Sequence, residues 1–117
     1  MFAVVNIIHS CAVDKCVVDF CHVHIIFGVV SDKDVDAIAP LMIKPDGHVS
    51  YIFTQPSTGR AMPVRRLAYM LKRHGIPGAT ASTVARAISR AKKEAAAEDL
   101  IFIGGSNFTV SDAVAVI

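Results

Sequence analysis

The chain has 117 residues, of which 53% are hydrophobic and 19% charged, and its formal net charge at pH 7 is +2. This length predicts one domain. The hydrophobic fraction exceeds the roughly 45–50% of typical soluble domains, which favours a buried parallel sheet or a surface that normally faces another domain. The small net charge argues against nucleic-acid binding. No apolar run approaches the roughly 18–20 residues that a membrane span needs.

Residues 1–22 form an atypical N-terminal segment, in which Ala3–Val5 can open a first strand and a degenerate helix can follow. Charged and histidine residues interrupt its apolar stretch, and it lacks the basic region and clean apolar core of a signal peptide. The three cysteines of the chain, Cys11, Cys16 and Cys21, show no evident disulfide framework. Such cysteine usage is typical of a reducing compartment, so we expect a cytoplasmic protein.

Residues 23–42 predict a buried strand followed by a helix, at the start of a domain that spans 23–117. The run 23–30 is apolar and β-branched, with a glycine near its end, as in strands buried on both faces. Ser31 or Asp32 can cap the following helix. Its apolar residues recur at helical spacing: Val35, Ile38, Ala39 and Met42.

A second strand and a basic helix come next. Residues 49–54 predict the strand, and the loop 55–59 leaves it. Pro63 suits the first position of a helix, and Gly75 suits its end. This helix has an apolar stripe made by Val64, Leu67, Ala68 and Leu71, and a basic outer face made by Arg65, Arg66, Lys72 and Arg73. The simplest interpretation of the basic face is that it is solvated.

The C-terminal part continues the alternation of strand and helix. Residues 79–81 predict a short strand, and Ser82 or Thr83 can cap the long helix after it. Residues 100–103 predict a last strand, which the turn 104–106 joins to a closing helix. Because these connections are too long for hairpins, the pattern predicts an α/β domain with a Rossmann-like, doubly wound, mostly parallel sheet and flanking helices.

Two loops at the carboxyl edge of that sheet carry suitable chemistry for a ligand. Ser31–Asp34 places Lys33 between two carboxylates, so the lysine can meet an anion, although acids at this position more commonly cap a helix. In Gly104–Ser106, glycines allow close approach of a ligand, and the helix start attracts anions. Ser106 either donates to a carboxylate or phosphate, or caps the helix. Arg60 either binds such an anion or is a solvated loop charge.

The cysteines and histidines near the N-terminus raise the question of a zinc site. The residues concerned are Cys11, Cys16, Cys21, His9, His22 and His24. Their spacing differs from the paired ligands, two to four residues apart, of structural zinc sites. Buried thiols are the commoner outcome. We therefore predict no metal site, and a metal-binding protein remains the third alternative.

Three segments share the order and spacing of one protein family. Residues 26–34 contain a glycine-bearing strand followed by Asp-Lys-Asp, residues 59–63 form an arginine loop before a helix, and residues 98–110 form a strand with a Gly-Ser turn. Together they resemble the C-terminal domain, alone, of folylpolyglutamate synthase and dihydrofolate synthase, which belong to the Mur ligase superfamily. The resemblance covers about residues 23–117.

The resemblance implies an ATP-dependent ligase of folate biosynthesis and one-carbon metabolism. Such an enzyme forms an acyl phosphate on a folate or dihydropteroate carboxylate, which the amino group of glutamate then attacks. ATP and magnesium are held mainly by the N-terminal part, and the C-terminal domain closes over them. The resemblance implies substrate-binding roles for Ser106, Lys33 and Arg60, with Ser106 next to the incoming glutamate. It implies cofactor-binding roles for Asp32 and His9.

His9 belongs to Asn6-Ile7-Ile8-His9-Ser10, the nearest match to the family's nucleotide-contacting Asp-x-x-His-Asn motif. An amide replaces the carboxylate of that motif, and a hydroxyl replaces its amide. No stretch of the sequence matches the phosphate-binding loop. We therefore expect a truncated product, a disrupted reading frame or an excised domain that lacks the N-terminal and central ligase domains.

Such a chain has no catalytic residue of its own and holds no cofactor tightly, so we expect it to be inactive alone. The alternative function is a standalone Rossmann-like binding module that self-associates into a homo-oligomer.

Overall fold

The computed structural model describes the backbone of residues 4–8 and all of residues 22–117. From residue 23 onward, strands alternate with helices, as the sequence predicts. The elements in chain order are β1 (Val4–Ile8), β2 (Val23–Phe27), α1 (Val35–Ile38), the 3₁₀ helix η1 (Ala39–Leu41), β3 (Val49–Phe53), α2 (Val64–Arg73), β4 (Ala79–Thr80), α3 (Val84–Glu94), β5 (Leu100–Gly104) and α4 (Asn107–Val116).

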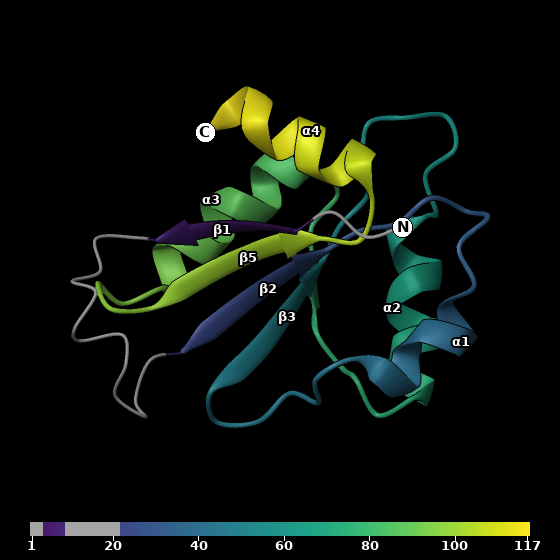
Figure 1. Ribbon diagram of the computed structural model, residues 1–117, viewed down its shortest axis with the longest axis horizontal. Helices are drawn as coiled ribbons and strands as arrows, with labels where there is room; N and C mark the ends of the chain where they lie inside the picture. Colours follow the sequence, from purple (N-terminus) through teal and green to yellow (C-terminus); the bar gives the residue numbers. More distant parts are fainter. Residues whose placement is uncertain (1–3, 9–21) are drawn as a thin grey trace.

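The described strands form a single sheet in the order β1-β5-β2-β3-β4 (Figure 1). β5, β2, β3 and β4 run parallel to one another, whereas β1 pairs antiparallel with β5 at the edge. The expected α/β class with a mostly parallel sheet is confirmed, and the arrangement is consistent with a Rossmann-like fold.

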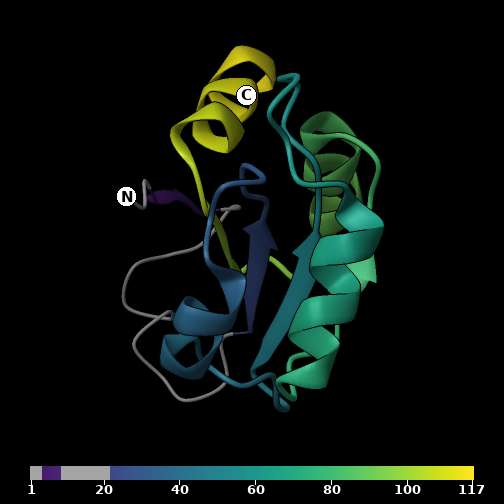
Figure 2. The ribbon, with the colours of Figure 1, turned by 90° about the vertical axis from the view of Figure 1, so that its right-hand side faces the viewer.

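Helices cover both faces of the sheet (Figures 1 and 2). Because neighbouring residues of a strand point to opposite faces, Phe53 packs toward Leu67 of α2, while Ile52 packs toward Ile88 of α3. The core is therefore double, with α1 and α2 over one face and α3 and α4 over the other. None of the helices in residues 22–117 is long and apolar enough to cross a membrane.

The winding direction of the chain reverses between β2 and β5. From β2 the chain passes through α1 to β3 and through α2 to β4, always on one face. α3 then crosses back over the other face, and β5 joins the free side of β2. In doubly wound sheets a crevice opens at such a reversal, at the carboxyl ends of the strands.

The segment after β2 differs locally from the sequence prediction. The strand ends at Phe27, and Val30 instead forms an isolated bridge with Ala61. The helix cap is Asp34 rather than Ser31 or Asp32, because its carboxylate accepts the backbone N–H of Ala37 at 3.1 Å.

α1 is also shorter than the apolar spacing suggests. It ends at Ile38 and continues as η1. Pro40 explains this end, because proline has no N–H to donate to an earlier carbonyl. Ala39 is nevertheless buried, and Met42 packs against the same core, so the predicted stripe does face inward.

The two basic helices begin and end close to the predicted positions. Pro63 lies just before α2, and Gly75 follows α2 with a φ of 78°, a conformation that favours glycine. Thr83 caps α3 by accepting the backbone N–H of Arg86 at 3.1 Å.

Candidate functional site

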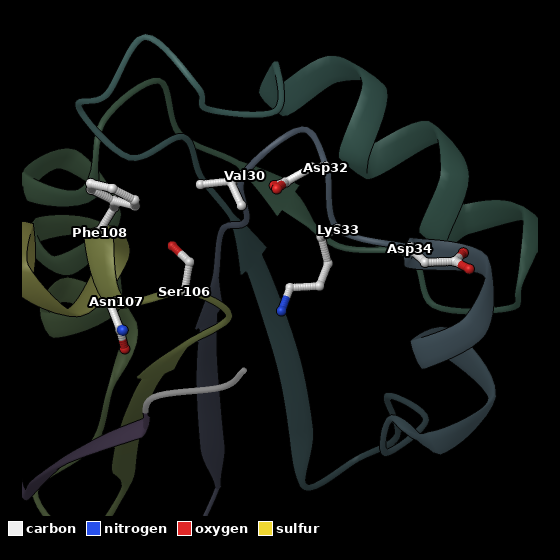
Figure 3. A pocket seen from close by; sticks show the side chains of 7 residues that line it. All are labelled: Val30, Asp32, Lys33, Asp34, Ser106, Asn107 and Phe108. Carbon is white, nitrogen blue, oxygen red and sulfur yellow. The ribbon is translucent and has the colours of Figure 1, made fainter.

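An open hollow of about 360 Å³ lies at the reversal point between β2 and β5 (Figure 3). It is lined by Val30, Asp32, Lys33, Asp34, Ser106, Asn107 and Phe108. These residues come from only two segments, the β2–α1 loop and the start of α4. The two loops that the sequence singled out therefore form the walls of one site.

Two glycines let the walls approach each other at the base of the hollow. Gly105 has a φ of 111°, a value that side chains with a Cβ rarely adopt. A Cβ at Gly105 would lie 2.2 Å from the carbonyl oxygen of Gly28. The backbone N–H of Gly28 also donates to the carbonyl of Gly104 at 3.2 Å. The turn between β5 and α4 is thus packed directly against the end of β2.

Ser106 is the N-cap of α4 and is buried, with 4% of its surface exposed. Its Oγ accepts the backbone N–H of Thr109 at 3.2 Å and lies 3.1 Å from Thr109 Oγ1. The Thr109 hydroxyl donates its proton to the Gly28 carbonyl at 2.8 Å. Because a hydroxyl carries one proton, the hydroxyl of Ser106 is then the donor in its bond to Thr109.

Ser106 therefore stabilises the start of α4, since its proton and one lone pair are both used in hydrogen bonds to Thr109. An anion in the hollow would meet the first backbone N–H groups of α4, at Asn107 and Phe108, rather than the Ser106 proton. The first N–H groups of a helix have no acceptor within the helix and lie at its positive end.

We predict that Thr109→Val destabilises the domain by about 1–3 kcal/mol, because the isosteric change leaves the Gly28 carbonyl and the Ser106 hydroxyl buried without their partner. Urea denaturation followed by circular dichroism measures this change. Thr58→Val is the control in the half-exposed loop after β3, where Oγ1 accepts only a long 3.3 Å bond from Arg60 N. Equal effects of the two substitutions would contradict the inferred network.

Lys33 is the cation of the hollow. It is half-buried, and its side chain extends into the space between the two walls (Figure 3). Asp34 points away from that space and caps α1. Asp32 lines the hollow but forms an exposed ion pair with Arg60, with 3.1 Å between Oδ2 and the guanidinium nitrogen. Of the three charged side chains in this loop, that of Lys33 is the one that extends into the hollow (Figure 3).

Arg60 lies at the rim of the hollow rather than in its lining. Besides pairing with Asp32, its guanidinium carbon lies 5.9 Å from the centroid of the Phe108 ring. The backbone carbonyl of Arg60 accepts both the N–H and the hydroxyl of Ser31. Arg60 thus connects the β3–α2 loop to both walls of the site.

His9 lies outside the described residues. Asn6, from the same motif, lies within β1 and pairs with Phe102 in the middle of β5. β1 runs away from the hollow, toward the amino end of β5, because Ile8 pairs with Leu100 at the start of β5. β1 itself therefore does not end at the hollow.

The cysteines Cys11, Cys16 and Cys21 also lie outside the described residues. Within residues 22–117, no group of three His, Cys, Asp or Glu side chains could hold a metal ion. His22 instead shares a 2.9 Å hydrogen bond with the hydroxyl of Ser50, and His24 bonds to Asp99.

The sequence pattern did not predict the pair formed by His24 and Asp99, because the two residues are 75 positions apart. Both are buried, and Nε2 of His24 lies 3.0 Å from Oδ2 of Asp99. Asp99 also accepts the backbone N–H groups of His22 and Ala96, at 3.1 and 2.8 Å. Burial raises the pKa of the Asp99 carboxyl, but these hydrogen bonds and the charge of His24 together hold that pKa below its usual value.

This cluster lies at the amino ends of β2 and β5, whereas the hollow lies at their carboxyl ends. Sequence reasoning also missed Phe108 and Thr109, which follow the Gly-Ser turn on α4. A polar residue three positions after a capping serine was the signal available for Thr109.

Comparison with protein-family models, with curated proteins and with solved structures gives no significant match to this chain.

Proposed function

We propose that this chain is the C-terminal domain of an ATP-dependent ligase that joins glutamate to a folate or dihydropteroate carboxylate. Its hollow would form one wall of the glutamate and ATP cleft. The supporting observation is the position of Arg60, which pairs with Asp32 and lies over Phe108. Through these contacts the three segments that carry the family resemblance meet at the carboxyl ends of the parallel strands.

The chemistry of the hollow suits a carboxylate or a phosphate group. Lys33 supplies a compact positive charge on one wall. The start of α4 supplies backbone N–H groups and the positive end of the helix dipole on the other wall. Lys33 and the first residues of α4 line the same hollow (Figure 3). We therefore assign this space to the carboxylate of the incoming glutamate.

The described residues fit one face of a nucleotide site but not the magnesium site. Asp32 and Asp34 are the carboxylates at the hollow, and they are engaged with Arg60 and with the N–H of Ala37. Phosphoryl transfer depends on metal ions and donors placed around the phosphates. In the proposed enzyme these are supplied by the other ligase domains, so this chain contributes binding groups and no chemistry of its own.

We predict weak binding of L-glutamate at the hollow and no ATP hydrolysis by the chain alone. In an amide NMR titration, the shifts should be largest at Lys33, Asn107 and Phe108. Lys33→Ala should weaken binding about fivefold, because an exposed charge contact contributes about 1 kcal/mol. Lys92→Ala on α3 removes the same charge away from the hollow and should leave binding unchanged.

Phosphate release with folate, glutamate and ATP present tests the second half of this prediction. Turnover by the purified chain would contradict the proposal, as would glutamate-induced shifts that are absent from both walls of the hollow.

A chimera tests the assignment to a ligase more directly. The chain replaces the C-terminal domain of an active folylpolyglutamate synthase, and glutamate-dependent ADP formation is measured. We expect activity in the chimera and a lower kcat/KM for glutamate when it carries Lys33→Ala. A folded chimera that forms no amide would count against the proposed function.

The apolar surface of α4 favours a second candidate, a self-associating module. Val114, Val116 and Ile117 are exposed by 63%, 50% and 60%. Such a surface is typical of a contact with another protein or domain. In the ligase proposal the other ligase domains cover it, whereas in the alternative a second copy does. Sedimentation equilibrium separates the two, because a monomer at all concentrations excludes self-association.

A further inference from the structure

The outer face of α2 is strongly basic and carries no acidic residue. Its four cationic residues are all exposed: Arg65, Arg66, Lys72 and Arg73. The opposite side of the helix is buried through Leu67 and Leu71. α2 lies at the outside of the molecule (Figure 2).

The stability of α2 does not explain these charges. Arg65 and Arg66 lie in the first turn, where the helix dipole is already positive and cations are unfavourable. Pro63 precedes the helix without a capping side chain, although Gln55 accepts the N–H of Val64 at 2.9 Å. Neither arginine forms an ion pair with any residue of the described part of the chain. This placement costs stability, so a binding role is favoured.

α3 provides the contrast on the other face of the sheet. Its basic residues include Arg90, which pairs with Glu94 at 3.2 Å one turn later. Lys92 and Lys93 lie in the last turn, where the helix dipole favours cations. Arg90, Lys92 and Lys93 are therefore placed where they stabilise α3. Arg86 is the exception, because it lies in the first turn of the helix.

An exposed aromatic ring lies among the cations of α2. Tyr69 is 64% exposed, and the guanidinium carbon of Arg73 lies 5.9 Å from its ring centroid. Tyrosine and arginine are enriched in protein–protein interfaces and at their energetic centres. Their combination on one exposed helix face therefore indicates a polypeptide partner.

We propose that the basic face of α2, formed by Arg65, Arg66, Tyr69, Lys72 and Arg73, binds an acidic polypeptide segment. The helix of 10 residues is about 15 Å long, which suits one short segment that carries several carboxylates. Guanidinium groups bind carboxylates through paired hydrogen bonds. Nucleic acid fits less well, because the net charge is only +2 and the face has a single exposed aromatic ring. None of these five residues lines the hollow, so the inference is independent of the proposed ligase function.

Fluorescence anisotropy with a labelled oligo-L-glutamate peptide tests this inference. We expect R65E/R66E to weaken binding at least about tenfold, because it reverses two charges at the contact. R86E/K93E on α3 changes the net charge equally and should alter binding by less than about twofold. R65E/R66E places acidic side chains in the first turn of α2, where they complement the helix dipole, so thermal unfolding should show a folded variant.

Three outcomes would overturn the proposal. Equal weakening by the α2 and α3 variants would show a response to net charge alone. Tighter binding of a labelled single-stranded oligonucleotide of the same charge would assign the face to nucleic acid. Charge attraction is strongest at low ionic strength. A failure of the peptide to bind under that condition would contradict an acidic polypeptide partner.

Discussion

Gly105→Ala is expected to destabilise the domain by at least about 3 kcal/mol. The backbone there has a φ of 111°, and the new Cβ would lie 2.2 Å from the Gly28 carbonyl oxygen. A residue held in such a conformation costs about 1–3 kcal/mol, and forcing an atom into a packed site adds a similar amount. Because that oxygen is backbone, it cannot move aside as a flexible side chain would. Thermal unfolding should show a fall in Tm of about 10 °C or more.

Gly47→Ala is the matched control for this substitution. A Cβ at Gly47 would have no atom within 4 Å, and its φ is not positive. We expect its effect to stay within about 0.5 kcal/mol. A loss of stability as small in Gly105→Ala would show that the walls of the hollow are not held by close backbone contact.

Asp99→Asn is expected to destabilise the domain by about 3 kcal/mol at neutral pH. The carboxylate accepts hydrogen bonds from His24 and from the N–H groups of His22 and Ala96. An amide offers one acceptor oxygen and directs its own N–H₂ at donors, so buried groups lose their partners. Loss of one partner from a buried pair costs about 3–5 kcal/mol.

The pair formed by Asp36 and His74 is the control for that buried pair. Its 2.8 Å contact is as short as that of His24 and Asp99, but 71% of the Asp36 side chain is exposed. Exposed pairs contribute about 0–1 kcal/mol, so Asp36→Asn should change stability little. Similar effects of the two substitutions in urea denaturation would contradict the importance of burial.

The contribution of Asp99 should also depend on pH. The folded pKa of its carboxyl is lowered, whereas the unfolded chain has the ordinary value of about 3.9. Between these two values the unfolded state binds the proton more readily, so acid favours unfolding. The stabilisation by the charge is complete above the unfolded pKa and is lost as pH falls toward the folded pKa. The stability difference between the native chain and Asp99→Asn should therefore begin to shrink as pH falls below about 5, and it should continue to shrink until pH reaches the lowered folded pKa.

Much of the secondary structure could be predicted because its signals are local. The apolar run of β2, the stripe of α2 and the cap at Thr83 all depend on residues within a few positions of one another. Errors appeared where a single residue competes with the pattern, as Pro40 does at the end of α1. Which of Ser31, Asp32 and Asp34 caps that helix depends on where the loop turns, and the pattern does not contain this information.

The role of Ser106 shows which part of the site could not be predicted from the sequence. The sequence leaves helix capping and ligand binding open, because both need a hydroxyl at the start of a helix. The structure shows the capping role, which Thr109 supports through a hydroxyl held by the Gly28 carbonyl 81 positions earlier in the chain. The substrate-binding role of Ser106 stays a prediction. Arg60 is similar, since its pairing with Asp32 depends on the bridge between Val30 and Ala61.

The sequence by itself determined the order of strands and helices, and it singled out the two loops that line the hollow. Tertiary structure alone decided that β5 lies beside β2 with β1 antiparallel at the edge, and that His24 meets Asp99. The physical reason is how far apart in the sequence the interacting residues lie. Local patterns set which residues are apolar and which can cap a helix, whereas only the packed chain determines which polar groups hold the fold together and which remain for a ligand.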